Sequence, residues 1–156
     1  MKKGLLILVA VLGLGFAANA QNWIGVRGVL GSSKGAELSF QHGLNANNRL
    51  ELDLGWNIGK KHEDNYNYYN LSAVYQWMGG IVDNLGWFAG VGANVGIWSG
   101  YNDGNIGLGF LAQAGLEYNF QAAPFQITLD FRPQWDVLGA ASGFGYAGAL
   151  GIRYRF

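Results

Sequence analysis

The sequence predicts an all-β protein, an eight-stranded antiparallel up-and-down β-barrel. Hydrophobic residues make up 50% of the chain, yet beyond residue 20 no segment has 18 consecutive apolar residues. Apolar and polar residues alternate instead, which is the period of a strand with two different faces. The chain also contains 26 glycines and only two prolines, and so much glycine disfavours a helical bundle. Together these observations favour a closed sheet of strands joined by short turns.

Eight segments with this alternation follow one another along the chain. They cover residues 23–31, 36–43, 49–58, 66–78, 85–98, 105–118, 125–135 and 144–156. The connections are short and rich in turn-forming residues, as in Asn45-Ala46-Asn47-Asn48 and Tyr101-Asn102-Asp103-Gly104. The most charged connection covers residues 60–65. Because no linker interrupts the series, we expect one barrel domain over residues 21–156.

The first 20 residues have the features of a cleavable signal peptide. Lys2 and Lys3 precede the apolar residues 5–16, and small residues flank a cleavage site after Ala20. The apolar stretch is shorter than the about 20 residues that a transmembrane helix needs. We therefore expect a mature chain that begins at Gln21. The sequence contains no cysteine, which excludes a lipid-modified cysteine, disulfides and thiolate metal sites.

The two faces of the predicted strands differ strongly in residue size. The interior of an eight-stranded barrel is only just wide enough for ordinary side chains, so the face with bulky residues must point outward. The bulky face includes Leu50, Leu52, Leu54, Trp56, Ile58, Leu71, Tyr75, Trp77, Trp87, Val91, Val95, Ile97, Ile106, Leu108, Phe110, Phe125, Ile127, Leu129, Phe131 and Trp135. The opposite face includes Gly90, Gly92, Gly96, Gly107, Gly109, Gly115, Gly145 and Gly151. This distribution favours a membrane barrel over a soluble ligand-binding barrel.

Charged residues within the strands give a second test, because they lie on the face with the small residues. An arginine facing lipid at the bilayer centre costs about 2–4 kcal/mol, against a net domain stability on the order of 10 kcal/mol. The charged face should therefore line the lumen. The predicted luminal polar network consists of Arg27, Glu37, Glu51, Asp53, Glu117, Asp130, Arg132, Arg153 and Arg155.

We expect these luminal charges to pair with one another, because an unpaired buried charge is costly. Arg153 and Arg155 should meet Glu51, Asp53 and Glu117 in the half of the barrel that holds the chain ends. Asp130 and Arg132 should lie further along the seventh strand. A paired network that fills the lumen is favoured over a polar path for small solutes, since small barrels hold packed side chains.

Aromatic residues gather near the ends of the predicted strands, as in the interfacial girdles of membrane barrels. One group comprises Trp77, Trp87, Tyr118, Phe125, Tyr154 and Phe156, and the other Trp56, Tyr69, Trp98, Trp135 and Phe144. The last strand reads Phe-Gly-Tyr-Ala-Gly-Ala-Leu-Gly-Ile-Arg-Tyr-Arg-Phe from residue 144, with bulky groups on one face and two arginines on the other.

Residues 21–156 resemble the small bacterial outer-membrane β-barrels of the OmpA and OmpX type, often grouped as porin-family proteins. The resemblance rests on this last strand, on the eight alternating segments and on the signal peptide that precedes them. The resemblance implies an eight-stranded antiparallel up-and-down transmembrane β-barrel, preceded by a cleavable signal peptide. It also implies contact with outer-membrane lipid, periplasmic termini of the mature chain, and recognition of Phe156 by the barrel-assembly machinery. Unlike better-known members, the chain has short predicted outer loops, around 32–35, 59–65, 99–104 and 136–143. Short loops disfavour adhesion or receptor roles carried by loops.

Motifs that could carry chemistry lack the required context. Residues 31–35 match G-x-S-x-G and residues 143–148 match G-x-G-x-x-G, but neither precedes a helix as those sites require. His42 and His62 should lie on opposite rims, and no serine accompanies His62 in its loop. We therefore expect no catalytic, cofactor-binding or metal site, and the absence of a basic patch disfavours nucleic acid as a partner.

Three functional classes follow from these observations. The favoured one is a monomeric, non-catalytic integral barrel with a structural or partner-binding role in the envelope. The alternatives are a narrow pore for small solutes and an outer-membrane enzyme that modifies lipid, for which His62 would be the catalytic candidate.

Overall fold

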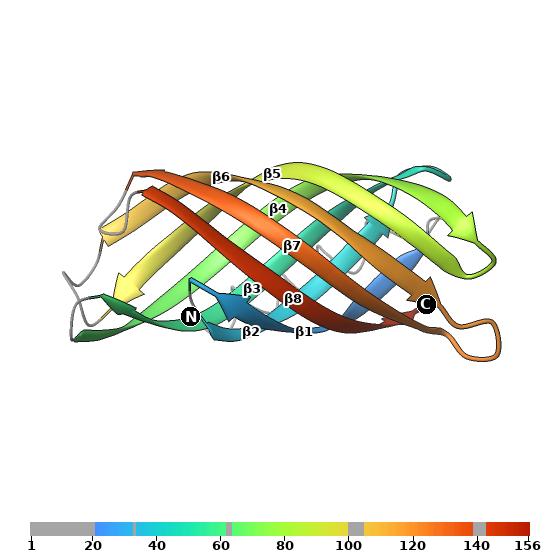
Figure 1. The fold of residues 1–156 in the computed structure, drawn as a ribbon, viewed down its shortest axis with the longest axis horizontal. Coiled ribbons are helices and arrows are strands. Elements are labelled where there is room, and N and C mark those ends of the chain that lie inside the picture. Colours follow the sequence, from blue (N-terminus) through green and yellow to red (C-terminus); the bar gives the residue numbers. More distant parts are fainter. Residues whose placement is uncertain (1–20, 33, 62–63, 100–104, 139–142) are drawn as a thin grey trace, which may run out of the picture.

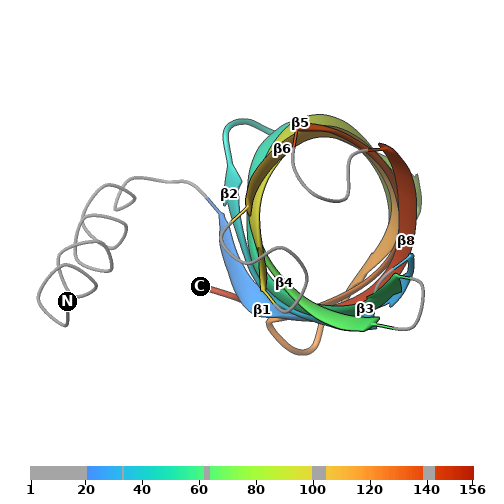
Figure 2. The same cartoon turned by 90° about the vertical axis from the view of Figure 1, so that its left-hand side faces the viewer.

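The strands form one closed barrel in which each strand pairs antiparallel with the next and β8 pairs with β1 (Figures 1 and 2). The structure, a computed structural model, describes residues 21–32, 34–61, 64–99, 105–138 and 143–156. The expected signal peptide, with cleavage after Ala20, lies outside these residues. Within them, no helix is long and apolar enough to cross a membrane. The eight-stranded antiparallel up-and-down barrel that the sequence predicts is confirmed.

Each predicted segment corresponds to one strand, and most strands are longer than predicted. The strands are β1 (Asn22–Gly31), β2 (Lys34–Gly43), β3 (Asn48–Lys61), β4 (Asp64–Val82), β5 (Leu85–Ser99), β6 (Asn105–Asn119), β7 (Phe125–Leu138) and β8 (Gly143–Arg155). The predicted charged loop 60–65 belongs largely to the hairpin of β3 and β4, where Lys61 pairs with Asp64. Backbone pairing continues there because it satisfies N–H and C=O groups whatever the side chains are.

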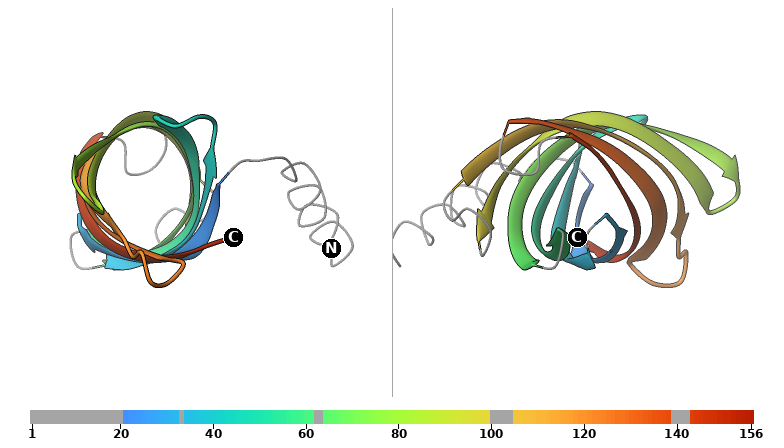
Figure 3. Two further views of the ribbon diagram at one scale, coloured as in Figure 1. Left: turned by 90° about the vertical axis from the view of Figure 1, so that its right-hand side faces the viewer. Right: turned by 60° about the vertical axis from the view of Figure 1, so that its left-hand side comes forward.

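The two ends of the barrel differ in what they carry. Asn22 and Phe156 exchange backbone hydrogen bonds at 3.4 and 3.0 Å, so the start of β1 and the end of β8 share one rim. We call it the terminal rim; it also carries the connections after β2, β4 and β6, and Figure 3 shows the barrel from this end (left panel). The opposite end, the distal rim, carries the connections after β1, β3, β5 and β7.

The outer surface is apolar and the interior is polar. Along β7, exposed and buried residues alternate from Phe125 to Arg132, with the apolar residues outside. Among residues whose burial is described, 21 buried side chains are polar or charged and only seven are hydrophobic, which is the reverse of a soluble protein core. The predicted outward face of the last strand is confirmed, since its bulky residues are exposed: Phe144, Tyr146, Leu150, Ile152, Tyr154 and Phe156.

Three aromatic side chains depart from the expected small inner face. Trp23, Tyr68 and Phe88 are buried inside the barrel. The inner glycines make room for them: a Cβ atom at Gly96 would collide with the Tyr68 ring, and one at Gly115 would lie 2.7 Å from the Phe88 ring. Glycines on the inner wall therefore let long side chains from neighbouring strands lie across them.

Candidate functional site

A cluster of charged side chains fills the interior of the barrel. Its centre is Arg27 of β1, whose guanidinium is fully buried. Arg27 lies 2.8 Å from Asp53, 2.7 Å from Asp130, 3.1 Å from Glu51 and 3.2 Å from Glu37. These carboxylates come from β2, β3 and β7, so one arginine ties together strands that are far apart around the barrel.

Two further arginines complete this central cluster. Arg132 donates to Glu37 at 3.2 Å and to Asp53 at 2.8 Å. Arg153 donates to Glu51 at 2.8 Å. We define the central cluster as Arg27, Arg132, Arg153, Glu37, Glu51, Asp53 and Asp130. Every member is at least nine-tenths buried and has an oppositely charged partner, so the cluster meets the condition under which buried ions are tolerated.

Neutral side chains bind further groups of the cluster. Arg153 also donates to the hydroxyl oxygens of Ser39 at 3.0 Å and Thr128 at 2.9 Å. The amide of Gln113 donates to Glu51 and Asp130, at 3.1 Å in each case. The interior is therefore a continuous hydrogen-bonded network rather than a set of separate ion pairs.

The placement of Asp130 and Arg132 differs from the expectation. The sequence predicted that they would lie apart from Glu51 and Asp53, but all four belong to one cluster. The reason is geometric, because the strands of a closed barrel are tilted and staggered. Residues at different distances from the ends of their strands can therefore lie at the same level of the lumen.

Arg155 was wrongly placed in the luminal network. It is exposed, and no ion pair joins it to another described residue. Arg155 is the last residue of β8, at the terminal rim, where an inward side chain reaches solvent instead of the packed lumen. Its expected partner Glu117 instead lies 2.6 Å from Arg49, a buried residue that the predicted network omitted. Arg49 shares the strand face of Glu51 and Asp53, so the same alternation could have identified it.

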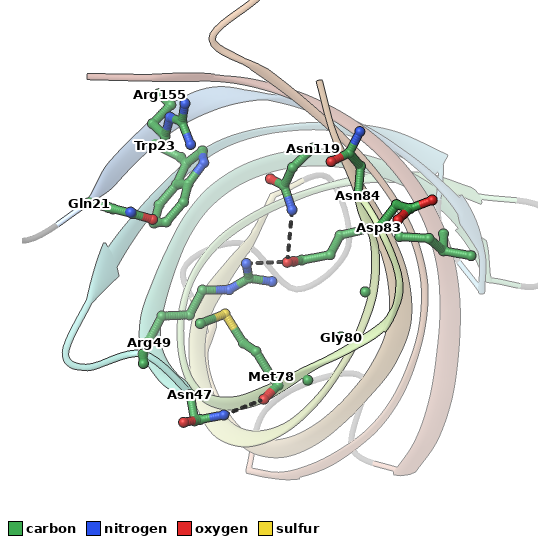
Figure 4. Close-up of a pocket in the computed structure, with 15 residues that line it drawn as sticks. Gln21, Trp23, Asn47, Arg49, Met78, Gly80, Asp83, Asn84, Asn119 and Arg155 are labelled. Atoms are coloured by element: carbon green, nitrogen blue, oxygen red, sulfur yellow. Dashed lines mark hydrogen bonds and ion pairs between the residues drawn. The ribbon is translucent and has the colours of Figure 1, made fainter. Parts of the chain in front are cut away.

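A vestibule opens at the terminal rim, with the Arg49–Glu117 pair in its wall (Figure 4). Its volume is about 330 Å³, and its other lining groups include Trp23, Asn119 and Arg155. Arg49 lies over the Phe88 ring at 5.0 Å and donates from Nε to Gln76 at 2.5 Å. These contacts fix the guanidinium, so the vestibule has a rigid, ion-paired wall next to the packed lumen.

Hydroxyl and imidazole groups of the described interior and terminal rim contact polar neighbours. The hydroxyl groups of Ser39 and Thr128 are bound by Arg153. His42 lies at the terminal rim, where its Nδ1 atom is 2.8 Å from Asn22 Oδ1. His62, the candidate for a lipid-modifying enzyme, lies outside the described residues.

Solved structures show what the fold is similar to. Neisserial surface protein A matches with a TM-score of 0.67 at 13% identity, over 88% of this chain and 96% of that one. The N-terminal β-barrel domain of Pseudomonas aeruginosa OprF matches with a TM-score of 0.59 at 20% identity, and the match covers 87% of this chain and 97% of that one. A third match is Ail, the attachment invasion locus protein of Yersinia pestis, solved in complex with the heparin analogue sucrose octasulfate. Its TM-score is 0.54 at 14% identity, and the match covers 89% of this chain and 100% of that one.

No protein-family model matches the sequence, and no curated protein matches it. The chain nevertheless has the closed eight-stranded antiparallel barrel of these small outer-membrane barrels. At such low identities, the likeness shows the fold alone.

Replacing Arg27 by Met should destabilise the barrel by about 3–5 kcal/mol, because four carboxylates would lose their shared cation. Arg155→Met, at the exposed end of the same lumen-facing pattern, should change stability by no more than about 0.5 kcal/mol. Urea-induced unfolding in lipid vesicles, followed by tryptophan fluorescence, measures both. Equal effects of the two variants would refute the assignment of Arg27 as the centre of the cluster.

Proposed function

We propose that this protein is a non-catalytic integral β-barrel of the bacterial outer membrane, with a structural or partner-binding role in the envelope. One observation carries the proposal: the closed barrel is apolar outside and filled by paired charges inside. An apolar outer wall suits lipid, and barrel closure leaves no unpaired sheet edge within it. The similarity of the fold to small outer-membrane barrels supports the same location.

The packed interior favours a structural role over conduction. Arg27, Glu51 and Asp53 are each no more than 1% exposed, so solvent does not reach the middle of the lumen. A conducting path would require the central cluster to separate, and separating paired buried ions is strongly unfavourable. The narrow pore is therefore the second candidate, and the lipid-modifying enzyme remains a prediction that depends on His62.

The proposal also includes an orientation and an assembly route. The terminal rim should face the periplasm, so that the mature chain has both ends on that side. Phe156 is exposed at this rim, where the barrel-assembly machinery could bind it, and its role as an assembly signal stays a prediction. A monomeric state agrees with the closed barrel, because closure leaves no sheet edge for a second chain to pair with.

Planar-bilayer recordings of the refolded protein should show no stable unitary conductance, because the central cluster occupies the lumen. Insertion into the bilayer should be checked in parallel by protease protection. Stable steps that change in the Glu51→Ala or Arg153→Ala variant, but not in the Arg155→Ala control at the rim, would contradict the proposal and favour the pore.

Cysteine labelling in whole cells should test the location and orientation, since the chain has no native cysteine. A membrane-impermeant maleimide should label Ser32→Cys at the distal rim of intact cells. Ala46→Cys, in the connection after β2 at the terminal rim, should react only after the outer membrane is permeabilised. The reverse pattern would overturn the orientation, and equal labelling of both variants in the soluble fraction would overturn the membrane location.

A further inference from the structure

Negative charge exceeds positive charge in the described lumen. The buried charged side chains are four arginines and six carboxylates, which leaves two negative charges in excess. Arg27, Arg132 and Arg153 are engaged in the central cluster, and Arg49 pairs with Glu117. Among the buried carboxylates, Asp136 of β7 has no ion pair with any arginine or lysine whose side chain the structure describes.

Asp136 lies toward the distal rim and is only 8% exposed. Within the described part of the chain, its carboxylate accepts hydrogen bonds from two neutral amides. Gln134 Nε2 contacts both oxygens at 2.9 and 2.8 Å, and Asn94 Nδ2 contacts Oδ1 at 3.1 Å. Neutral donors orient a carboxylate without cancelling its charge. A buried carboxylate in this setting is stabilised by a cation.

A second oxygen beside Asp136 has no hydrogen-bond donor. Asn94 is 3% exposed, and its Oδ1 atom accepts no hydrogen bond from the described residues. The orientation of its amide is fixed, because Nδ2 donates to Asp136 and to the Tyr68 hydroxyl at 3.0 Å. Rotating the amide by half a turn would place its oxygen against the Asp136 carboxylate, which is unfavourable.

Asp136 Oδ1 and Asn94 Oδ1 lie close together over the inner face of Gly109. Asn94, Gly109 and Asp136 form one row across β5, β6 and β7, with the glycine between the other two. A Cβ atom at Gly109 would collide with Asp136 Oδ1 and would lie 2.7 Å from Asn94 Oδ1. Both oxygens therefore lie over the inner face of Gly109, where only the absence of a side chain leaves them room.

We propose that Asp136 and Asn94 form a binding site for a hard cation of the Ca²⁺ class in the distal part of the lumen. A carboxylate and an amide carbonyl are oxygen ligands that such ions prefer, and water from the distal rim can complete the 6–8 ligands of Ca²⁺. The described residues offer no group of three or more His, Cys, Asp or Glu side chains for a metal, so a softer transition metal has no matching ligand set.

The single carboxylate sets the expected strength of the site. Ca²⁺ affinity rises with the number of charged ligands, so we expect a site with one carboxylate to lie at the weak end of the range, with a Kd of about 0.1–1 mM or higher. With the distal rim facing the exterior, as in the proposed function, such a site would respond to cation levels outside the cell.

Terbium luminescence tests the proposal directly, because Tb³⁺ substitutes for Ca²⁺ and is excited by a neighbouring aromatic ring such as Tyr68. The refolded protein in non-ionic detergent should give a saturable signal that millimolar Ca²⁺ displaces. Asp136→Asn should raise the Kd more than about tenfold, and Asn94→Ala about 10–100-fold. Asn94→Asp should retain or strengthen binding, and Asp83→Asn, at the terminal rim, should leave the titration unchanged.

Folding of each variant is checked by the heat-dependent shift in its electrophoretic migration. If Asp136→Asn does not fold, the contrast between Asn94→Ala and Asn94→Asp decides the question. Unchanged terbium binding in Asp136→Asn, or the absence of a saturable signal in the unmodified protein, would overturn the proposal.

Discussion

The interior of this barrel depends on Arg27 and the four carboxylates around it. An eight-stranded barrel has a narrow lumen that side chains must fill, and here the filling is ionic. Burying so many charges is tolerated when they are paired, and Arg27 is the partner that Glu37, Glu51, Asp53 and Asp130 share. The cluster therefore links β1 to β2, β3 and β7 across the lumen, in addition to the backbone ladders between neighbouring strands.

Inner glycines and outer bulky residues are two consequences of this arrangement. Gly96 and Gly115 leave room for Tyr68 and Phe88, which lie inside the barrel together with the charged groups. The outer wall needs no such space and carries the aliphatic and aromatic residues. The lumen consequently has three levels: a vestibule with the Arg49–Glu117 pair, the central cluster, and a distal layer of amides around Asp136. A shared barrel fold leaves the function open, since function depends on such sites rather than on the fold.

The inward and outward faces could be predicted from the sequence because the two-residue period of a strand is local. The partners of Arg27 could not, because they depend on the tilt and stagger of the whole barrel. Arg155 shows the limit of the local pattern. It alternates in step with the inward-facing residues of β8, but it is the last residue of that strand and lies where the lumen ends. Asp136 shows another limit, since it was predicted in a loop and instead continues β7 with a buried side chain. Only its strand pairing with Gly109 reveals its contact with Asn94.

The central claim is that Arg27 and its carboxylates act as one coupled unit, and a double-mutant cycle between Arg27→Met and Asp130→Asn measures this coupling. The two side chains are joined by hydrogen bonds of 2.7 Å. In the unmodified protein Asp130→Asn removes a partner of Arg27, whereas in the Arg27→Met background it removes an excess negative charge. The account predicts that the cost of Asp130→Asn to the free energy of unfolding falls by at least about 1 kcal/mol in that background. Additive effects, within about 0.5 kcal/mol, would contradict it.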